Sequence, residues 1–410
     1  MQYFLNKQVE SLGCYDVVIA GGGISGFAAA LSAKRAGARV AVLESSGMLG
    51  GMATLGHVSV FMPVGNDMGI YRELLNGFLD RNRILDPTDS GITFDCCRLR
   101  AYLSHFLTEE GVEVFYHCKL ADAFTENDSV RAVAVLTVEG LKAVEGAAFV
   151  DCTGNGCLAI AANEEHFSGR EQDGNTQAMT LIFEMTKTGA KTDILPSYYR
   201  KIERMEDTPQ GRAVIFTVGD SRILVNMTRA RGNGARIKDL NRAETELLGQ
   251  VYPVADFLNR NGYDGYEVTS IASVAGVRES NQIVCKYKLT AEDVRSGRKS
   301  RNVVAQSRYC VDIHSPTGGK STEKFDVGYY DIPYDCMVPL RNKNLLVCGR
   351  AICADHTAIS SARVMPTCMA LGQAGGVAAA LAARAGVSMA DVPIDTLHAL
   401  LKEQGVVFDR

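Results

Sequence analysis

The chain has 410 residues, of which 43 are Lys or Arg and 47 are Asp or Glu, so its formal net charge is −4. Hydrophobic residues make up 46% of the sequence and charged residues 22%, a composition that excludes an intrinsically disordered protein. The slightly acidic balance argues against a nucleic-acid or anionic-membrane surface, so we expect chemistry on small molecules.

Residues 1–13 lack the basic head and long apolar run of a secretory signal. The longest apolar stretches, such as 377–383, fall far short of the roughly 18 residues that a membrane span requires. The 12 cysteines are spread over the whole chain without a CxxC pair, which is typical of free thiols rather than of a metal site. We therefore expect a cytoplasmic protein without a bound metal.

A strand–turn–helix–strand unit is predicted next. Residues 15–20 are rich in β-branched side chains and are typical of a buried parallel strand. The pattern G-x-G-x-x-G follows at 21–26, then a small-residue helix over 27–36 and a second strand over 38–43 that ends at Glu44. All these parts occur in order within about 30 residues, which is the setting that a dinucleotide-binding turn requires.

Each glycine of this pattern has a physical role. Gly21 permits the tight turn, Gly23 lets the backbone approach a pyrophosphate, and Gly26 lets the helix pack closely on the strand. The helix N-terminus favours the anion, and Glu44 can accept hydrogen bonds from both hydroxyls of a ribose. Glycine-rich turns also occur for packing alone, but the surrounding elements favour the nucleotide site.

The segment after Glu44 indicates which dinucleotide is bound. It reads E-x5-GG-x-A-T, with the glycine pair at Gly50 and Gly51. A second glycine pair implies another close approach of backbone to ligand, as an extended flavin dinucleotide demands. NAD sites rarely continue in this way, and a simple loop is the remaining alternative. The segment resembles the FAD-binding end of the glutathione-reductase and fumarate-reductase type flavoprotein superfamily.

Later elements fit this resemblance. A helix is predicted over 98–110, a third strand over 112–117 and a small β-meander over 120–146. FVDCTGNG at 149–156 resembles the second flavin fingerprint of the superfamily. Another buried strand is predicted over 344–349.

The whole pattern resembles a bacterial FAD-dependent oxidoreductase family whose members carry three motifs. The first is GG-x-A-T at 50–54, and the last is R-V-M-P-T-C-M-A-L-G-Q-A-x-G at 363–376. The middle motif, R-E-S or R-x-S-R-x-I, begins at Arg278. It has Asn281 and Gln282 where basic residues are usual, which leaves the charge of the substrate pocket open.

The resemblance implies an FAD site built from distant segments. Glu44 with Ser45 would hold the adenosine ribose, and the backbone of Leu120 would contact the adenine. Arg350 stands where many flavoproteins of the superfamily have Asp, and an arginine can pair with a phosphate oxygen or a pocket carboxylate. The implied cofactor residues are Gly21, Gly23, Ile24, Ser25, Gly26, Glu44, Ser45, Gly50, Gly51, Met52, Thr54, Leu120, Thr153, Gly154, Gly349, Arg350, Val364 and Met365.

A long helix is predicted over 364–385. Pro366 suits its first turn, because the missing N–H of proline would be unpaired there. In the family this N-terminus points at the flavin pyrimidine, where a helix dipole worth roughly 0.3 to 2 kcal/mol would stabilise the reduced anion. Arg363 would add to this effect, with a surface ion pair as the alternative role.

Residues 159–330 lack the βαβ rhythm and predict an inserted cap, with strand-like runs at 178–185 and 213–228 and helix around 243–260. Substrate clefts concentrate at such domain junctions. Arg278 follows a predicted strand end, where its guanidinium can clamp a substrate carboxylate.

Histidines complete the set of catalytic candidates. Asp312 and His314 alternate along VDIH and should share one strand face, so the Asp can orient the imidazole for proton transfer. His356 lies close to the flavin by analogy, while His57, just after GG-x-A-T, ranks lower. For a lone histidine, a structural hydrogen-bonded role is an equal alternative.

The sequence thus predicts an α/β fold: a Rossmann-like FAD-binding domain of parallel sheet plus β-meander, formed by 1–158 and 331–410, with an inserted α+β substrate/cap domain over 159–330. The predicted activity is hydride transfer between a small organic substrate and flavin N5, as a dehydrogenase or reductase. The predicted catalytic residues are Arg278, His314, His356 and Arg363.

Two other classes of function stay open. A flavin-dependent hydroxylase would need NAD(P)H to reach the flavin. A scaffold of the thiazole-synthase type would hold the nucleotide without redox turnover. The sequence leaves the substrate, the electron donor or acceptor and the oligomeric state undetermined.

Overall fold

Strand β1 (Glu10–Ala20) is the centre of the largest sheet in the computed structural model. It pairs in parallel with β2 (Val40–Leu43) on one side and with β9 (Gly140–Asp151) on the other. Val17 and Val18 pack into hydrophobic clusters on opposite faces, so the strand is buried on both sides. The structure describes residues 8–65, 68–82, 85–88, 91–189, 195–316 and 322–408.

The strands of this sheet follow the order β6 (Glu113–Phe115), β2, β1, β9, β8 (Val130–Thr137) and β7 (Lys119–Thr125). β20 (Leu345–Val347) also pairs with β9. β9 is long enough to pair with both strands along its length. Its first half pairs antiparallel with β8, and its last residues pair parallel with β20. The predicted parallel sheet and β-meander are therefore confirmed.

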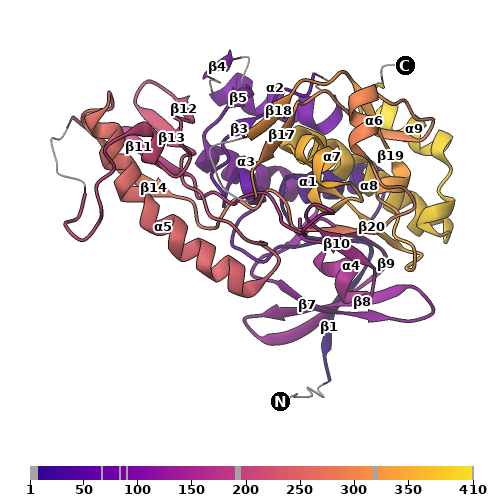
Figure 1. Ribbon diagram of the computed structural model, residues 1–410. Coiled ribbons are helices and arrows are strands. Elements are labelled where there is room, and N and C mark those ends of the chain that lie inside the picture. Colours follow the sequence, from indigo (N-terminus) through magenta and orange to yellow (C-terminus); the bar gives the residue numbers. More distant parts are fainter. Residues whose placement is uncertain are drawn as a thin grey trace.

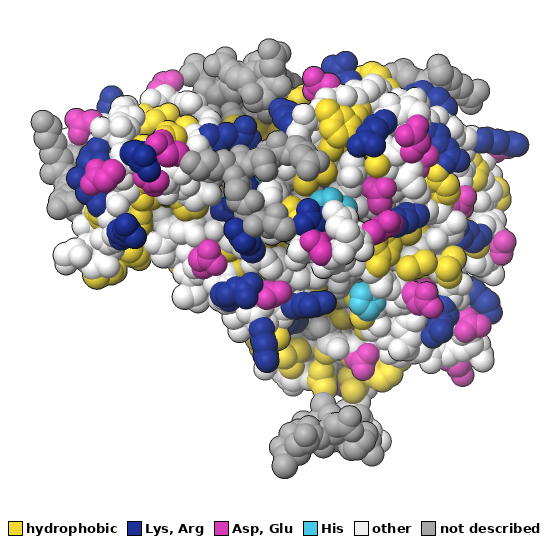
Figure 2. Space-filling view, viewed as in Figure 1, with side chains coloured by type: hydrophobic (Ala, Val, Ile, Leu, Met, Phe, Trp, Pro, Cys, Tyr) yellow, Lys and Arg dark blue, Asp and Glu magenta, His cyan; other side chains and the backbone are white. Residues whose placement is uncertain are grey.

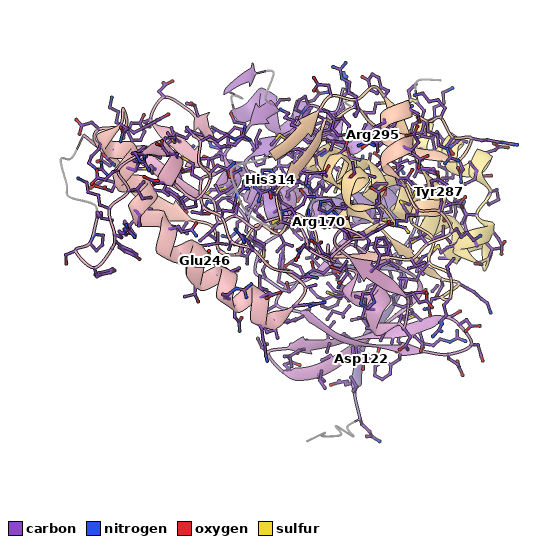
Figure 3. All side chains as sticks on the ribbon, in the orientation of Figure 1. Asp122, Arg170, Glu246, Tyr287, Arg295 and His314 are labelled. Carbon is purple, nitrogen blue, oxygen red and sulfur yellow. The ribbon has the colours of Figure 1, made fainter. Side chains whose placement is uncertain are left out.

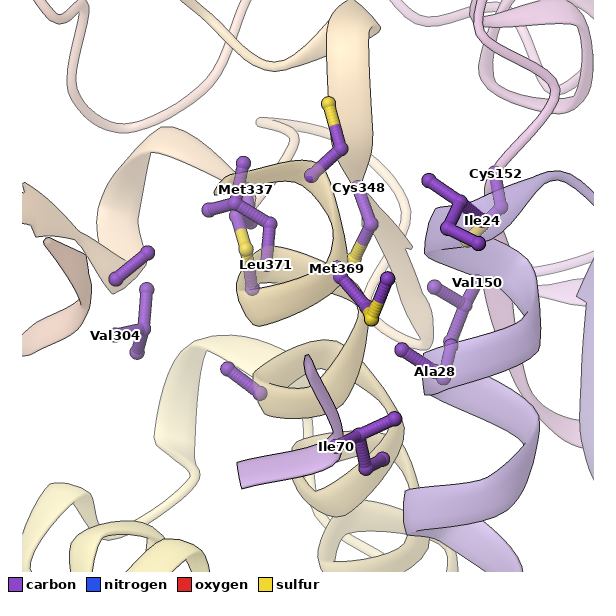
Figure 4. Close-up of a cluster of buried hydrophobic side chains, with 14 of the residues drawn as sticks. Ile24, Ala28, Ile70, Val150, Cys152, Val304, Met337, Cys348, Met369 and Leu371 are labelled. Atoms are coloured by element: carbon purple, nitrogen blue, oxygen red, sulfur yellow. The ribbon is translucent and has the colours of Figure 1, made fainter. Parts of the chain in front are cut away.

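Helices α1 (Ile24–Arg35) and α8 (Met365–Ala385) pack against each other in the main hydrophobic cluster, part of which Figure 4 shows. Glycines make this close approach possible. A Cβ at Gly372 would overlap the carbonyl oxygen of Ser25, and a Cβ at Gly376 would overlap a carbonyl oxygen one turn further along α1. The first half of α1 and the middle of α8 therefore touch backbone to backbone.

Helix α8 begins with Pro366 in its first turn, as predicted. Among the described residues it is the one helix whose length and apolar composition would suffice to cross a bilayer. In the folded chain, however, 94% of its most apolar window is buried inside the protein. A helix that is apolar all round and covered on all sides is typical of the core of a large protein.

The predicted helix after the glycine loops is α3 (Cys96–Glu109), which begins two residues earlier than expected. The Asp95 side chain caps it by accepting hydrogen bonds from the backbone N–H groups of Cys97 and Arg98. The other elements around the main core are α2 (Gly69–Asn82), α4 (Cys157–Ala161), α6 (Ala291–Ser296), α7 (His356–Ala362), α9 (Ile394–Glu403), β3 (Val60–Phe61), β4 (Leu85–Thr88), β5 (Gly91–Thr93), β10 (His166–Ser168) and β15 (Asn281–Ile283).

A second sheet forms the lobe at the left of Figure 1. Its antiparallel strands follow the order β12 (Ile215–Val218), β13 (Arg222–Val225), β11 (Phe183–Lys187) and β14 (Tyr266–Ile271). Helix α5 (Ile237–Arg260) packs on this sheet with one apolar face, and together they enclose a hydrophobic cluster of their own. The predicted succession of strand runs and a long helix is confirmed here.

Two hairpin-like pairs follow this lobe in the chain. β16 (Val303–Ser307) pairs with β19 (Tyr330–Pro333), and β17 (Val311–His314) pairs with β18 (Thr322–Phe325). Their buried apolar residues join the cluster that contains α1 and α8 rather than the one under α5. The cap boundaries expected at 159 and 330 stay a prediction.

The surface carries both signs of charge. Figure 2 shows Lys and Arg side chains interspersed with Asp and Glu over the visible face. This mixture agrees with the near balance of 43 basic and 47 acidic residues.

The contact between α1 and α8 can be tested with one methyl group. Gly372→Ala should lower the free energy of unfolding by about 1–3 kcal/mol, because the backbone of α1 must move to admit the new Cβ. Urea denaturation measures this change.

The control is Gly249→Ala in α5, where no atom of a neighbouring element lies within 4 Å of the added Cβ. The control should be neutral or stabilising by up to about 1 kcal/mol, since Ala favours helix over Gly. Similar effects of the two substitutions would contradict the packing argument.

Candidate functional site

The first glycine turn lies between the ends of β1 and β2, where parallel strands present their carboxyl ends. Two hydrogen bonds hold its backbone. The N–H of Gly21 donates to the carbonyl of Leu43 at 2.8 Å, and the N–H of Gly50 donates to the carbonyl of Gly22 at 2.8 Å. The second glycine pair therefore rests directly on the first turn, and residues 21–26 and 50–54 form one continuous backbone surface.

The positions of this surface require glycine for different reasons. A Cβ at Gly21 would lie 2.6 Å from the carbonyl oxygen of Cys152, and a Cβ at Gly26 would overlap the carbonyl oxygen of Gly21. Packing inside the protein therefore explains both. At Gly23 an added Cβ would meet only the Cα of Gly51, at 3.9 Å. The space in front of Gly23 is left open by the protein, as a ligand that approaches the backbone requires.

Glu44 closes the second strand and is 5% exposed. Its carboxylate accepts hydrogen bonds from the N–H of Gly22 at 2.9 Å and from the N–H of Ser46 at 2.7 Å. The Ser45 hydroxyl also donates to this carboxylate, at 3.2 Å, so of about four lone-pair positions one remains for a ribose hydroxyl. The carbonyl of Glu44 also accepts from the N–H of Cys118. This bond brings the start of β7, and with it Leu120, next to the predicted ribose site.

An open pocket of about 450 Å³ lies beside this loop, between Gly47, Met48 and the first turns of α3. Arg100 and His105 of α3 line it. Sequence reasoning did not single out Arg100. The guanidinium of Arg100, in this pocket near the loop that follows Glu44, would suit a phosphate-bearing ligand.

The second fingerprint is organised by a buried acid that sequence reasoning also missed. Asp151, at the end of β9, accepts hydrogen bonds from the N–H and the hydroxyl of Thr153 and from the N–H of Ala159, at 2.7–2.9 Å. Burial raises the pKa of Asp151 above its ordinary value. These bonds shape the turn at Thr153 and Gly154, whose neighbour Cys152 packs against the first glycine turn.

Arg350 follows Gly349 at the end of β20 and reaches neutral partners. It donates to the hydroxyl of Ser280 at 2.6 Å and to the side-chain oxygen of Asn155 at 2.8 Å. Burial lowers the pKa of Arg350 to about 10. The expected pairing with a phosphate or a pocket carboxylate stays a prediction, because among the described residues these oxygens are its hydrogen-bond partners. A Cβ on Gly349, which has φ +75°, would lie 3.2 Å from the Ser25 side chain.

The N-terminus of α8 lies next to this region. Its N-cap residue is Val364, which offers no capping side chain, so the N–H groups of the first turn have no side-chain acceptor there. Within the described part of the chain, the buried hydroxyl of Thr367 also has no hydrogen-bond partner. Unpaired donors at a helix N-terminus favour an anionic ligand.

The predicted Asp312–His314 pair is present on β17. The Nε2 of His314 lies 3.2 Å from the Asp312 carboxylate, and its Nδ1 lies 3.1 Å from Nη2 of Arg229. Arginine can only donate, so Nδ1 accepts and Nε2–H donates to Asp312. Burial and then the positive charge of Arg278 lower the pKa of His314 to about 3, so the ring is neutral at pH 7. Figure 3 shows His314 near the middle of the molecule, between α5 and α7.

Asp312 is surrounded by positive charge. Burial alone would raise its pKa, but the hydrogen bond from His314 and the charges of Arg363 and Arg278 outweigh burial and hold the pKa well below its ordinary value. Arg363 donates to the backbone carbonyl of Asp312 at 3.1 Å, and its Nη2 lies 3.8 Å from the carboxylate. Two of the predicted catalytic residues, His314 and Arg363, therefore meet at one carboxylate.

Arg278 belongs to the same cluster. One of its terminal nitrogens donates to the carbonyl of Ala178 and to the hydroxyl of Thr180, both at 2.7 Å. Burial, followed by the charges of Arg363 and Arg229, lowers the pKa of Arg278 to about 9. These effects place three guanidinium groups within electrostatic reach of one another.

His356, the first residue of α7, is held by a different acid. Its Nδ1 lies 2.8 Å from the carboxylate of Glu279, which is 1% exposed. Glu279 also accepts the backbone N–H of Gln177 at 2.9 Å. Glu279 is the second residue of the R-E-S motif, and this motif was the available signal for its role. Gln177 and Arg229 had no local signal, because their partners lie far away in the sequence.

His57 also lies inside the protein. Burial lowers its pKa, and within the described residues its Nδ1 has no hydrogen-bond partner. Its φ of +49° is uncommon for a non-glycine residue.

Comparison with known proteins shows the family to which the chain belongs. The sequence profile of the family described as FAD dependent oxidoreductase matches residues 16–401. FAD is the cofactor of this family, and the space in front of Gly23 fits it. No curated protein sequence matches the chain.

Solved structures that are similar to the chain have low sequence identity. One is a geranylgeranyl bacteriochlorophyll reductase-like protein from Thermoplasma acidophilum, with 13% identity, TM-score 0.49, and 96% of this chain and 84% of that chain covered. Another is an anhydrotetracycline hydroxylase from Streptomyces rimosus, with 18% identity, TM-score 0.46, and 95% and 66% covered. A third is a flavin-dependent brominase, with 13% identity, TM-score 0.49, and 95% and 83% covered.

The different roles of Gly23 and Gly26 give a test of the cofactor cradle. Gly23→Ala should weaken FAD binding roughly tenfold or more, because the methyl group occupies the space left for the ligand. The apoprotein should unfold at an unchanged urea concentration, since the φ of −63° at Gly23 suits alanine. Gly26→Ala should instead destabilise the apoprotein. Flavin absorbance after dialysis and urea denaturation measure the two effects. Full FAD retention in Gly23→Ala would exclude the proposed approach of the cofactor.

Proposed function

Because the chain belongs to the FAD dependent oxidoreductase family, we propose that it transfers a hydride between a small organic substrate and the N5 atom of FAD. The two glycine turns, Glu44 and the fingerprint at 149–156 support a place within the glutathione-reductase and fumarate-reductase type superfamily. The observation that carries the proposal is the buried cluster of arginine, histidine and carboxylate groups beside the N-terminus of α8.

FAD, when bound, supplies a two-electron donor or acceptor, and the protein supplies binding, orientation and charge. The pyrophosphate side would be held by the backbone of 21–26 and 50–54, and the ribose by Glu44. The first turn of α8 would face the flavin ring, where its unpaired N–H groups favour negative charge. Val364 and Met365 stay proposed contacts on the same grounds.

We assign the proton transfer to His356 rather than to His314. Both ring nitrogens of His314 are engaged by Arg229 and Asp312, so this ring positions its neighbours. His356 donates its Nδ1–H to Glu279, which leaves Nε2 as an acceptor. No hydrogen bond to Nε2 is formed by the described residues. An imidazole base commonly has one ring nitrogen held by a carboxylate while the other nitrogen accepts the proton.

Substrate orientation falls to the arginines. Arg278 is fixed at one nitrogen by Ala178 and Thr180, and Arg363 is fixed by the carbonyl of Asp312. A fixed guanidinium loses little further freedom when it binds, so it can hold a substrate in one pose against the flavin. The electron donor or acceptor on the other half of the reaction stays unidentified.

The proposed reaction predicts which substitutions stop substrate oxidation. The holoenzyme, mixed without oxygen with panels of polyols, sugars, carboxylates and unsaturated acids, should lose its flavin colour with at least one of them. His356→Gln should slow that bleaching roughly 10²- to 10⁴-fold, because the substrate proton loses its acceptor. Glu279→Gln should slow it less and should shift its pH profile, since the imidazole loses its orienting charge. The measurement is stopped-flow absorbance.

The control is His398→Gln in α9, whose ring contacts the carbonyl of Val303 away from the cluster. It should bleach at the rate of the unaltered enzyme. Rapid NAD(P)H oxidation coupled to a hydroxylated product would replace the proposal with the hydroxylase reading. Flavin that no substrate or reductant changes would favour a nucleotide-binding scaffold.

A further inference from the structure

We infer that the substrate is a carboxylate, bound by Arg229, Arg278 and Arg363; this inference rests on the proposed function and names its substrate class. The first observation is the local charge. The carboxylate of Asp312 lies 3.8 Å from Arg363 and interacts electrostatically with Arg278 and Arg229, and the neighbouring His314 is neutral. Positive charge therefore exceeds negative charge inside the protein.

The hydrogen-bond partners of the three arginines do not remove this excess. Arg229 donates to the side-chain oxygen of Gln210 and to His314, both neutral. Arg278 donates to a carbonyl and a hydroxyl oxygen. Arg363 donates to the carbonyl of Asp312 and lies near its carboxylate, which is the one acid in the described residues that contacts the cluster. Buried charges are normally paired, so this arrangement favours the binding of an anion.

The second observation is a set of unused donors. Nε of Arg229, Nε of Arg363 and the side-chain nitrogen of Gln177 are buried, and none has a hydrogen-bond partner in the part of the chain that the structure describes. Arg229 is 8% exposed and Gln177 is fully buried, so contact with bulk water does not supply hydrogen-bond partners for these donors. Buried donors without partners are rare in native proteins and call for a ligand that accepts hydrogen bonds.

The donors belong to one site. Arg363 donates to the oxygen of the same Gln177 side chain whose nitrogen is unused. The side-chain oxygen of Gln177 also accepts a hydrogen bond from the backbone N–H of His314, and the ring of His314 contacts Arg229. Gln177, Arg363 and Arg229 are thus connected through direct hydrogen bonds to shared neighbours.

A carboxylate matches this set of donors. Its two oxygens offer about four lone-pair positions in one plane, and a guanidinium presents its N–H groups in a planar fork of the same geometry. Glu279 accepts a hydrogen bond from the backbone N–H of Gln177 and also contacts His356, so Gln177 connects the proposed anion site to the Glu279–His356 pair. The substrate acid would then be anchored while His356 takes the proton.

The ligand itself supplies the sharpest test. Acetate, succinate and benzoate, added to the holoenzyme, should perturb the flavin spectrum and raise the melting temperature in a saturable way. Acetamide, succinamide and benzamide have nearly the same shape without the charge, and they should do neither. Equal binding of acids and amides, or no binding of any acid, would overturn the inference. Inorganic phosphate that binds more tightly than every carboxylate would also overturn it.

Variants locate the anion. Arg229→Gln and Arg363→Gln should each weaken binding of the effective acid roughly 10- to 100-fold, the loss expected for one charge-assisted hydrogen bond. Arg229→Lys and Arg363→Lys keep the charge and guard against a folding defect, and they should weaken binding less. Arg204→Gln, which removes an exposed partner of Asp207, should leave binding unchanged. A loss of binding in Arg204→Gln equal to that in the cluster variants would contradict the assignment.

The same measurements separate this inference from the proposed function. Saturable binding of an acid without flavin bleaching would keep the anion site and reject hydride transfer from that acid. Bleaching by a neutral substrate, at a rate that Arg229→Lys and Arg363→Lys do not change, would keep hydride transfer and reject the carboxylate.

Discussion

The close contact between α1 and α8 is the constraint on which both halves of the site depend. Gly372 of α8 lies against the carbonyl of Ser25, which belongs to the glycine motif at 21–26 where α1 starts. No side chain fits between them, so the first glycine turn and the N-terminus of α8 are held at a fixed separation. An extended cofactor that touches both ends is possible because backbone, rather than flexible side chains, sets this distance.

The second constraint is electrostatic. Arg229 is buried and Arg278 and Arg363 are partly buried; all three interact electrostatically with Asp312, and the neighbouring His314 is kept neutral. An excess of buried positive charge destabilises the protein by itself. Such an arrangement is typical of a binding site, where affinity for an anion is obtained at the expense of stability. This charge, more than the shape of the lobes, directs the choice of substrate class.

The segment around Glu279 connects residues that lie far apart in the sequence. Glu279 contacts both Gln177 and His356, and the next residue, Ser280, accepts a hydrogen bond from Arg350 beside the second fingerprint. Short, mostly buried bonds therefore link the cluster of arginines to the turn that the cofactor approaches. Proton transfer and substrate binding can be aligned because both rest on this one segment.

The sequence by itself determined the β1–turn–α1–β2 unit, the cofactor and the shared face of Asp312 and His314, because these depend on spacing within a few tens of residues. It also assigned close packing to Gly26 and open backbone to Gly23, and the structure agrees, since a Cβ at Gly26 would overlap the carbonyl oxygen of Gly21 whereas a Cβ at Gly23 would meet no atom closer than 3.9 Å. The tertiary structure alone decided the partners of His356 and the gathering of the arginines. Those contacts join residues about 77 to 85 positions apart, as for His356 with Glu279 and Arg229 with His314, and no local pattern encodes such pairs.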